Sequence, residues 1–414
     1  MKKIKIAIMN LCKKNDFIRK ISRSILNFLR KIKYFLTGIG KKTDAKTIMF
    51  ASFDGRKYVD SPKAIYECML KDKKFADYTF VWMFIEPEKF KYLEKNKNTV
   101  LVKYKSKEYY KYLHTSKYWF FNYKIHDNIC PKKNQIFVQC WHGTPLKRLG
   151  CDLINYDSAL NTVEEMKKRY HVEAKKFDYF ISPSAYATKV FTSAWNLKEI
   201  GKENIIIEEG YPRNDFLSKF TKDDVKKVKK ELGLPEDKKV ILYAPTYRAN
   251  QHTSGVGYTY KTEVDFDKLQ KALKDEYVIL FRAHYFVANN FDFDKYKGFV
   301  YNVSDYNEIN DLYIVSDMLI TDYSSVFFDY SILKRPMIFY MYDLDHYKNE
   351  SNGFYFDVEE ELPGPIIKEE KDLVKAIKDT KKFKYDEKYK RFNEKYTYLD
   401  DGNASIRVIN KIIK

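Results

Sequence analysis

A histidine in a loop that contains glycine and proline is the first residue that could do chemistry. His142 follows the mainly apolar run 135–140 and precedes Gly143 and Pro145. Imidazole is the side chain best matched to accepting a proton from an alcohol near neutral pH. Glycine permits a close backbone approach, and proline can open a helix. Taken alone, a histidine at a strand end is more often held by ordinary hydrogen bonds, and a base that faces a cleft is the alternative.

An arginine and a histidine follow a second apolar run, 277–281. Because side chains alternate along an extended chain, Arg282 and His284 point to the same side. Such a pair suits a diphosphate whose leaving group gains negative charge during a reaction. A surface arginine beside a core histidine explains the same residues, so this segment alone leaves both interpretations open.

Two serines follow a third apolar run, 318–321. Ser324 or Ser325 can cap the next helix, and the N-terminus of a helix offers free N–H groups and a positive dipole end to a phosphate. Helix capping without any ligand explains the two serines nearly as well. The serines therefore indicate a phosphate site only in combination with other residues.

Two more segments carry an arginine near an expected strand end. Arg248 lies in the segment 244–248, and Arg213 lies in the segment 211–215. Either guanidinium could meet phosphate across a hinge between two domains. No Walker-type or GxGxxG glycine pattern occurs, and the spacing of histidines and carboxylates suggests no metal site. We therefore expect a mechanism without metal or cofactor, in which arginines and helix ends neutralise phosphate.

The cysteines do not add a further reactive centre. The five of them are scattered, with no CxxC pair, which argues against a disulfide framework or a zinc site. A reducing cytoplasm is the simplest compartment for such a chain. Cys140 lies beside the central histidine, but no base and orienting group surround it, so a buried structural thiol is favoured over a nucleophile.

Short β-rich runs separated by helical stretches must position these residues. The first series covers 47–52, 78–84, 99–103, 118–122, 135–140, 177–182 and 205–208, and the second covers 239–244, 277–281, 298–303, 318–321 and 337–341. Several runs are apolar throughout, as strands buried on both faces of a parallel sheet are. A chain of 414 residues exceeds one hydrophobic core. We expect an α/β protein of two Rossmann-like, doubly wound domains, 43–218 and 219–414, that face a central cleft.

The net charge of +19 is concentrated at the N-terminus. Residues 1–42 contain 13 Lys or Arg and one Asp, a net charge of +12, which leaves +7 for the rest of the chain. Within residues 17–36 the apolar side chains recur at the spacing of one helical stripe, and cations fill much of the remainder. A basic amphipathic helix suits an anionic membrane surface, so we expect residues 1–42 to associate with a membrane and not with nucleic acid. Docking of this helix on its own protein is the alternative.

Neither a membrane-spanning helix nor export is expected. No run approaches the ~18 consecutive apolar residues that a spanning helix requires. The short apolar stretch 6–12 is followed by two lysines and by no small-residue cleavage site. The expected location is therefore peripheral, at the cytoplasmic face of the cell membrane.

Five segments taken together resemble one known family. They are WHGTPLK at 141–147, YPRND at 211–215, YAPTYR at 243–248, RAH at 282–284 and TDYSSVFFD at 321–329. In order and spacing they resemble the CDP-glycerol glycerophosphotransferase family of teichoic acid synthesis, over roughly residues 45 to 410. The resemblance implies a GT-B-like pair of domains. It also implies transfer of glycerol phosphate from CDP-glycerol to a hydroxyl of a lipid-linked acceptor, with release of CMP.

The resemblance also implies roles for single residues. His142 would be the general base on the acceptor hydroxyl, and His284 would be a second catalytic histidine that helps Arg282 to hold the pyrophosphate of the donor. Lys147 and Asn122 would bind the acceptor. The residues implied for donor binding are Trp141, Gly143, Thr144, Pro145, Arg213, Pro245, Thr246, Arg282, Ala283, Ser324, Ser325 and Asp329.

Several alternatives stay open at the level of the sequence. The chain is shorter than the long polymerases of the family and carries the basic helix in place of their extra N-terminal domain. A primase that adds one unit, a polymerase, and an enzyme for another polyol phosphate or surface polymer all fit. A GT-B nucleotide-sugar glycosyltransferase uses similar cations and helix ends. A non-catalytic binder of anionic surfaces or nucleic acid is the alternative from another class.

Overall fold

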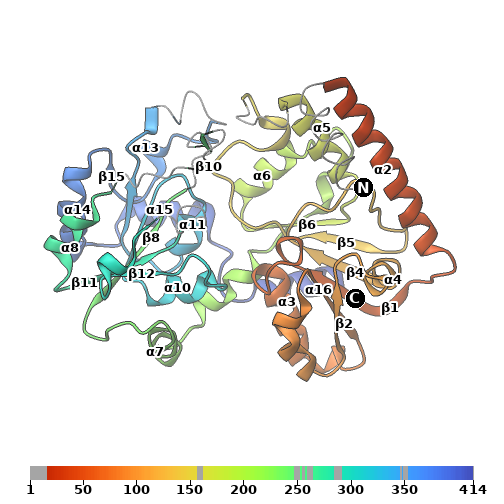
Figure 1. Ribbon diagram of the computed structural model, residues 1–414, viewed down its shortest axis with the longest axis horizontal. Helices are drawn as coiled ribbons and strands as arrows, with labels where there is room; N and C mark the ends of the chain where they lie inside the picture. Colours follow the sequence, from red (N-terminus) through yellow and green to blue (C-terminus); the bar gives the residue numbers. More distant parts are fainter. Residues whose placement is uncertain are drawn as a thin grey trace.

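Two parallel sheets, one in each half of the chain, form the framework of the protein and lie side by side (Figure 1). The computed structural model describes residues 16–155, 162–246, 252–253, 257–258, 264–283, 291–345, 347 and 353–413. The α/β class with two Rossmann-like sheets, which the strand pattern predicts, is confirmed.

The first sheet has seven strands in the order β3-β2-β1-β4-β5-β6-β7, all paired in parallel. They are β1 (Asp44–Ala51), β2 (Thr79–Phe84), β3 (Thr99–Lys103), β4 (Ser116–Phe121), β5 (Ile136–Gln139), β6 (Tyr179–Ser182) and β7 (Ile206–Glu208). The strand order reverses between β1 and β4, and ligands of doubly wound sheets bind beyond the carboxyl ends of the strands near such a reversal. The loops after β4 and β5 lie at this position and carry Asn122 and His142.

The second sheet has six strands in the order β12-β11-β8-β13-β14-β15, again all parallel. They are β8 (Lys239–Ala244), β11 (Tyr277–Phe281), β12 (Val300–Asn302), β13 (Met318–Thr321), β14 (Met337–Tyr340) and β15 (Ile366–Ile367), and β9 (His252–Thr253) pairs separately with β10 (Gly257–Tyr258). Every run that the sequence predicts as a strand corresponds to a strand of the two sheets. The sequence does not predict β15, because two residues are too few to show a pattern.

Each sheet is buried on both faces, as the continuous apolar runs predict. In β1, Ile48 and Phe50 point into one apolar cluster, while Met49 and Ala51 point into another on the opposite face. The alternating residues of β8 divide in the same way between two clusters of the second domain. Side chains that alternate between two cores explain why these strands show no polar face.

The helices connect and cover the strands. In the first half they are α2 (Asp16–Gly38), α3 (Asp60–Lys71), α4 (Lys107–Thr115), α5 (Val163–Ala174) and α6 (Ala185–Ala194). The later ones are α7 (Lys222–Glu231), α8 (Phe266–Leu273), α10 (Ile309–Val315), α11 (Val326–Ser331), α13 (Val358–Glu361), α14 (Leu373–Asp379), α15 (Glu387–Tyr396) and α16 (Ala404–Ile412). The 3-10 segment η6 (Pro212–Ser218) leads from the first domain into the second.

The chain returns to the first domain at its end. Ile409 and Ile412 of α16 pack with Ile48 of β1 in one apolar cluster. The carboxylate of Asp215, in η6, accepts hydrogen bonds from the first backbone N–H groups of α16 at 2.8 and 2.9 Å. The expected division into domains near residue 218 stays a prediction, and this packing places α16 with the first domain.

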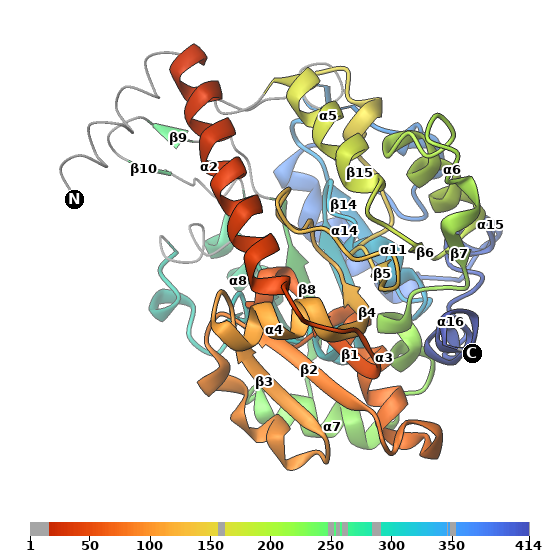
Figure 2. The same ribbon diagram turned by 90° about the vertical axis from the view of Figure 1, so that its right-hand side faces the viewer.

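Helix α2 runs along the first domain beside α4 (Figure 2). Tyr34 anchors it, because its hydroxyl donates to the Cys130 carbonyl at 2.9 Å and its ring lies 4.3 Å from that of His114. Among the side chains of α2 from residue 21 onward that the structure describes, the exposed large apolar ones are Ile21, Ile25, Leu26, Phe28, Leu29, Ile32, Phe35 and Leu36. Among the described residues, no helix has the length and apolar character needed to cross a membrane.

Candidate active site

The loop after β5 turns His142 toward the space between the domains. Trp141 has a φ of 47°, a left-handed conformation that is uncommon outside glycine and costs about 1–3 kcal/mol. Its backbone N–H donates to the Gln139 side chain at 3.0 Å, and its ring packs edge-on against Trp195 at 4.7 Å. These contacts hold a strained turn directly before the histidine.

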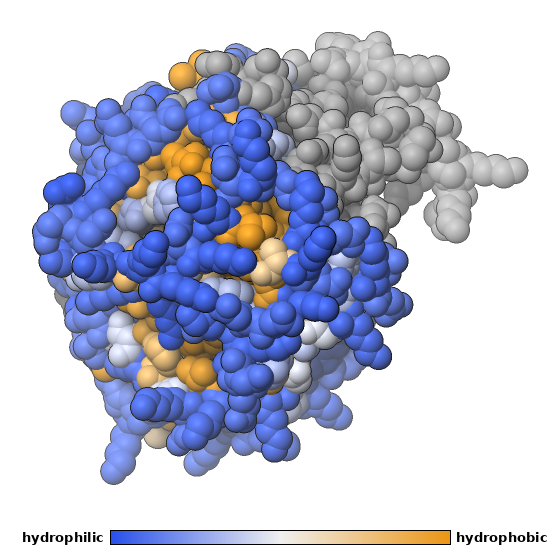
Figure 3. Space-filling model, turned by 90° about the vertical axis from the view of Figure 1, so that its left-hand side faces the viewer, coloured by the Kyte–Doolittle hydropathy of each residue, from blue (hydrophilic) through white to orange (hydrophobic). Residues whose placement is uncertain are grey.

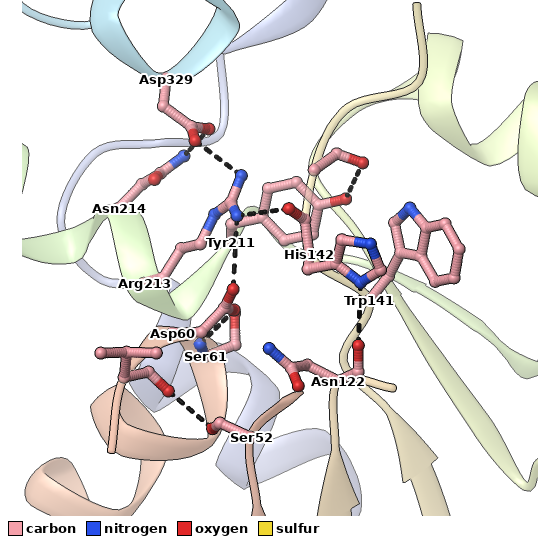
Figure 4. A network of polar contacts seen from close by, with 12 residues as sticks. Ser52, Asp60, Ser61, Asn122, Trp141, His142, Tyr211, Arg213, Asn214 and Asp329 are labelled. Atoms are coloured by element: carbon pink, nitrogen blue, oxygen red, sulfur yellow. Dashed lines mark hydrogen bonds and ion pairs between the residues drawn. The ribbon is translucent and has the colours of Figure 1, made fainter. Parts of the chain in front are cut away.

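The hydrogen bonds of His142 define its tautomer. Its Nδ1 lies 2.9 Å from the Asn122 carbonyl oxygen (Figure 4). A carbonyl only accepts hydrogen bonds, so Nδ1 carries the proton and Nε2 keeps a lone pair in the neutral ring. His142 is exposed at the cavity surface, but the protein packed around its ring removes part of its solvation and lowers its pKa, and Arg213 lowers it further, whereas the Asn122 hydrogen bond and Asp60 oppose the shift. The imidazole is therefore neutral near pH 7 and can accept a proton at Nε2.

The structure gives Asn122 a buried position that differs from the acceptor-binding position suggested by the sequence. We expected it to bind the acceptor, but its side chain is fully buried and its Oδ1 accepts from the Phe53 N–H at 2.8 Å. It belongs to the support of His142, because its backbone carbonyl orients the imidazole. A polar residue at a strand end can serve the site through its backbone alone.

The second domain contributes an arginine and two loops. Arg282 follows β11, and its Nη1 donates to the carbonyls of Val303 and Tyr306 at 3.1 and 2.8 Å. Burial lowers the pKa of Arg282, but a guanidinium stays protonated in proteins. Asp322 joins the loops after β8 and β13, since its Oδ1 accepts from the N–H groups of Thr246 and Tyr323 at 2.8 and 2.6 Å.

The serine hydroxyl at the start of α11 is not used for capping. Ser325 occupies the N-cap position, yet its side chain makes no capping hydrogen bond. A Cβ atom on Gly143 would lie 2.8 Å from the Ser325 Oγ, so the two domains approach closely here and glycine leaves room for the hydroxyl. The serine therefore faces the histidine loop across the domain boundary.

One cavity of about 500 Å³ collects most of the expected residues. From the predicted set it is lined by Trp141, His142, Gly143, Thr144, Pro145, Lys147, Pro245, Thr246, Arg282, Ala283, Ser324 and Ser325. His284 and Arg248 lie outside the described residues. Lys147 also forms a β-bridge with Phe354 of the second domain, and its ammonium lies 5.1 Å from the Tyr347 ring.

Arg213 and Asp329 do not line this cavity. Their side chains form a nearly buried ion pair, with Nη2 of Arg213 2.6 Å from Oδ2 of Asp329. Arg213 borders a second cavity of about 920 Å³, which lies on the same domain boundary and contains none of the other predicted residues. Because the two side chains bind each other, their placement does not support the expectation that both contact the donor.

Six further residues contribute to the cavity wall without a role assigned from the sequence. Leu146, Ala244, Tyr323 and Val326 lie within the quoted segments, and Leu149 and Ser304 lie outside them. Ser304 follows β12, as Arg282 follows β11. A search for polar residues directly after each predicted strand, which we call the strand-end rule, could therefore have found it. Nothing in the local sequence identifies Asp60, the first residue of α3, because it reaches Arg213 only once α3 is packed in its folded position. Within the described residues, no group of three or more His, Cys, Asp or Glu could hold a metal ion.

Two doubly wound domains that share a cleft at the carboxyl ends of their strands form a GT-B-like arrangement. The family model of CDP-glycerol:poly(glycerophosphate) glycerophosphotransferase matches residues 33–414, and the chain belongs to this family. The family that the five segments predict is thus confirmed.

Curated relatives and solved structures agree with this assignment. The teichoic acid poly(glycerol phosphate) polymerase of Bacillus spizizenii is 38% identical and aligns over 94% of this chain and 98% of its own length. The teichoic acid glycerol-phosphate transferase of Staphylococcus aureus is 37% identical over 91% of this chain and 95% of its own. A structure of the wall teichoic acid polymerase TagF soaked with CDPG is 37% identical, covers 97% of both chains and has a TM-score of 0.83. The chain spans about half the length of two other poly(glycerol phosphate) polymerases.

Proposed function

We propose that this enzyme transfers glycerol phosphate from CDP-glycerol to a hydroxyl of a lipid-linked teichoic acid acceptor and releases CMP. The observation that carries the proposal is a single cleft that brings a neutral imidazole together with Arg282 and two serines, in a chain of this family. An in-line attack on phosphorus needs a base on one side and neutralisation of the leaving group on the other. The proposed base lies on the wall formed by the first domain, and the groups that would neutralise the leaving group lie on the wall formed by the second domain.

The reaction proceeds in one displacement. Nε2 of His142 accepts the proton of the acceptor hydroxyl while its oxygen attacks the phosphorus that bears glycerol. The bond from this phosphorus to the bridging oxygen breaks, and the electron pair leaves with CMP. Arg282 and the hydroxyls of Ser324 and Ser325 stabilise the charge that develops on the leaving phosphate. The imidazolium then returns its proton to solvent.

A donor panel tests the proposal against a sugar transferase of the same fold. The enzyme is incubated with CDP-glycerol, CDP-ribitol and UDP-sugars, each with a lipid-linked acceptor, and the released nucleotide is separated by chromatography. We expect CMP from a CDP-polyol and no UDP from any sugar donor. Release of UDP from a UDP-sugar, with CDP-glycerol left intact, would contradict the proposal.

We further propose that α2 holds the enzyme at an anionic membrane surface on the cytoplasmic face of the cell membrane. Its exposed apolar side chains are accompanied by Arg30, Lys31 and Lys33 on the same helix. The face of the second domain seen in Figure 3 is mainly hydrophilic, with hydrophobic residues in patches between hydrophilic ones. A basic helix with exposed aromatic and aliphatic side chains fits a surface of anionic lipid.

The double substitution Phe28→Ser/Phe35→Ser is expected to weaken sedimentation with phosphatidylglycerol vesicles by at least tenfold. The two side chains are 63% and 71% exposed, so the change should not disturb the core. Burying one phenylalanine side chain contributes about 1.5–3 kcal/mol. The matched control is Ile154→Ser, a change at a side chain that is 68% exposed outside α2. Equal sedimentation of the double variant and the control would refute the membrane role of α2.

A further inference from the structure

We propose that Arg213 is a positioning residue that fixes the His142 loop of the first domain to helix α11 of the second domain. This inference rests on the proposed function, in which His142 is the base and the serines before α11 hold the donor. It replaces the donor contact that the sequence suggested for Arg213.

The guanidinium joins three partners from different elements (Figure 4). Its Nη1 donates to the His142 carbonyl at 2.7 Å and lies 3.4 Å from the Asp60 carboxylate of α3. Its Nη2 lies 2.6 Å from the Asp329 carboxylate, and Asp329 is one helical turn beyond Ser325. The Arg213 side chain is only 9% exposed, so little solvent competes for these contacts.

The residues around Arg213 strengthen the same connection. Tyr211 places its ring 4.8 Å from the guanidinium, and its hydroxyl donates to the Gly143 carbonyl at 3.0 Å. The Asn214 amide donates to the other oxygen of Asp329 at 3.1 Å. The segment 211–214 therefore holds two successive carbonyls of the base loop and both oxygens of the α11 carboxylate.

This arrangement sets the distance between the base and the donor site. His142 and the serines belong to different domains, so no single element fixes their separation. A misplacement of about 1 Å at a reacting centre can cost about 100-fold in rate. The β-bridge of Lys147 with Phe354 joins the far end of the base loop to the second domain, and Arg213 joins its beginning, because it contacts the backbone of the base and the helix that follows the serines.

Another ion pair across the domain boundary provides a matched control. Lys63 of α3 lies 2.7 Å from Glu308, which precedes α10 in the second domain. This pair also joins the domains, but it makes no hydrogen bond to the His142 loop. Loss of Lys63 should therefore affect domain packing without moving the base.

The first test reads the imidazole directly and does not depend on a donor. The protein has seven histidines, and His142→Gln identifies the His142 signals in spectra of 15N-histidine-labelled protein. Among the described residues, Asp60 and Arg213 are the charged groups that change the pKa of this ring: Asp60 raises it and Arg213 lowers it. In Arg213→Gln the pKa of His142 should rise and the population with the proton on Nδ1 should fall. Unchanged values in Arg213→Gln would overturn the proposal, and Lys63→Gln should match the wild type.

The second test is a double-mutant cycle in kcat. Arg213→Gln is expected to lower kcat about 100-fold with little change in the donor KM, and to add little in the His142→Ala background. Arg213→Lys keeps the charge but has one nitrogen in place of the planar fork whose Nη1 and Nη2 reach different elements, so it should lose most of the activity. Arg213→Gln/Asp329→Asn removes the unpaired carboxylate and serves if the single variant fails to fold. A rise in donor KM with kcat intact, or a full additional loss in the His142→Ala background, would contradict positioning.

The two tests separate the inference from the function on which it rests. If the wild type releases no CMP from any CDP-polyol, the proposed function fails while the histidine spectra still report on Arg213. If CMP is released and the spectra of Arg213→Gln match the wild type, only the positioning role fails.

Discussion

Replacement of His142 by alanine is expected to lower kcat for glycerol phosphate transfer by about 100- to 10,000-fold, the usual contribution of a general base. The KM for CDP-glycerol should change little, because the imidazole acts on the acceptor hydroxyl and not on the donor. His171→Ala is a suitable control, since this histidine lies in α5 and does not line the cavity. Initial rates of CMP release at varied donor concentration give both constants.

The pH dependence of kcat/KM, which reports the groups of the free enzyme, provides an independent check on the same residue. A histidine base works in its neutral form, so the rate rises with pH through its pKa. Desolvation lowers the pKa of His142 below its ordinary value of 6.5, which places the loss of activity on the acidic side of that pH. Near-wild-type kcat in His142→Ala would remove the residue as the base. A His142 that carries a glycerophosphoryl group in the mass spectrum of quenched enzyme would instead make it a nucleophile.

Replacement of Arg282 by alanine is the second large effect that we expect. The carbonyls of Val303 and Tyr306 orient this guanidinium at the cavity wall, where charge develops on the leaving CMP. Loss of one such group costs about 100- to 1,000-fold in kcat, and the donor KM should rise as well because the ground-state pyrophosphate is also bound. Arg282→Lys should retain part of the activity, because the lysine ammonium keeps the positive charge but lacks the planar guanidinium that can bind two oxygens at once.

The measurement is a full kinetic profile against CDP-glycerol, accompanied by direct titration of donor binding. Arg56→Ala is the control, because the Arg56 side chain is 63% exposed and donates to the Phe53 carbonyl and the Asp54 carboxylate, away from the cavity. Wild-type donor affinity together with wild-type kcat in Arg282→Ala would exclude Arg282 from the donor site.

The fold was accessible from the sequence because its signals are local. Continuous apolar runs such as those of β1 and β11 reflect burial on both faces, and their spacing indicates strands joined by helices. The strand-end rule also located His142, Arg282 and Ser325, since the carboxyl ends of parallel strands converge on one cleft. These residues reach the cavity from three different loops.

The residues that fix the geometry were not accessible in the same way. Asp60 has a φ of 69° and reaches Arg213 only through the placement of α3. Arg213 and Asp329 are far apart in sequence, and nothing in their local patterns shows that each neutralises the other. Asn122 acts through a backbone carbonyl, which every residue type carries. Such roles depend on long-range packing, and a single sequence does not encode them as a pattern.

The catalytic role of His284 stays a prediction, because the residue lies outside the described part of the chain. Its neighbour Ala283 lines the cavity, and the Ala283 N–H donates to the Ser304 hydroxyl at 3.2 Å. This places the end of the described segment at the donor side of the cleft, where the pair with Arg282 was expected.

The mass of the acceptor after reaction tests the central claim most directly. A synthetic lipid-linked acceptor is incubated with CDP-glycerol and either the wild type or His142→Ala, and CMP is quantified in the same samples. We expect the wild-type acceptor to gain glycerol phosphate units in equal number to the CMP released, and the His142→Ala acceptor to remain at its starting mass. An unchanged acceptor mass while the wild type releases CMP, or equal mass gains with both proteins, would contradict this account.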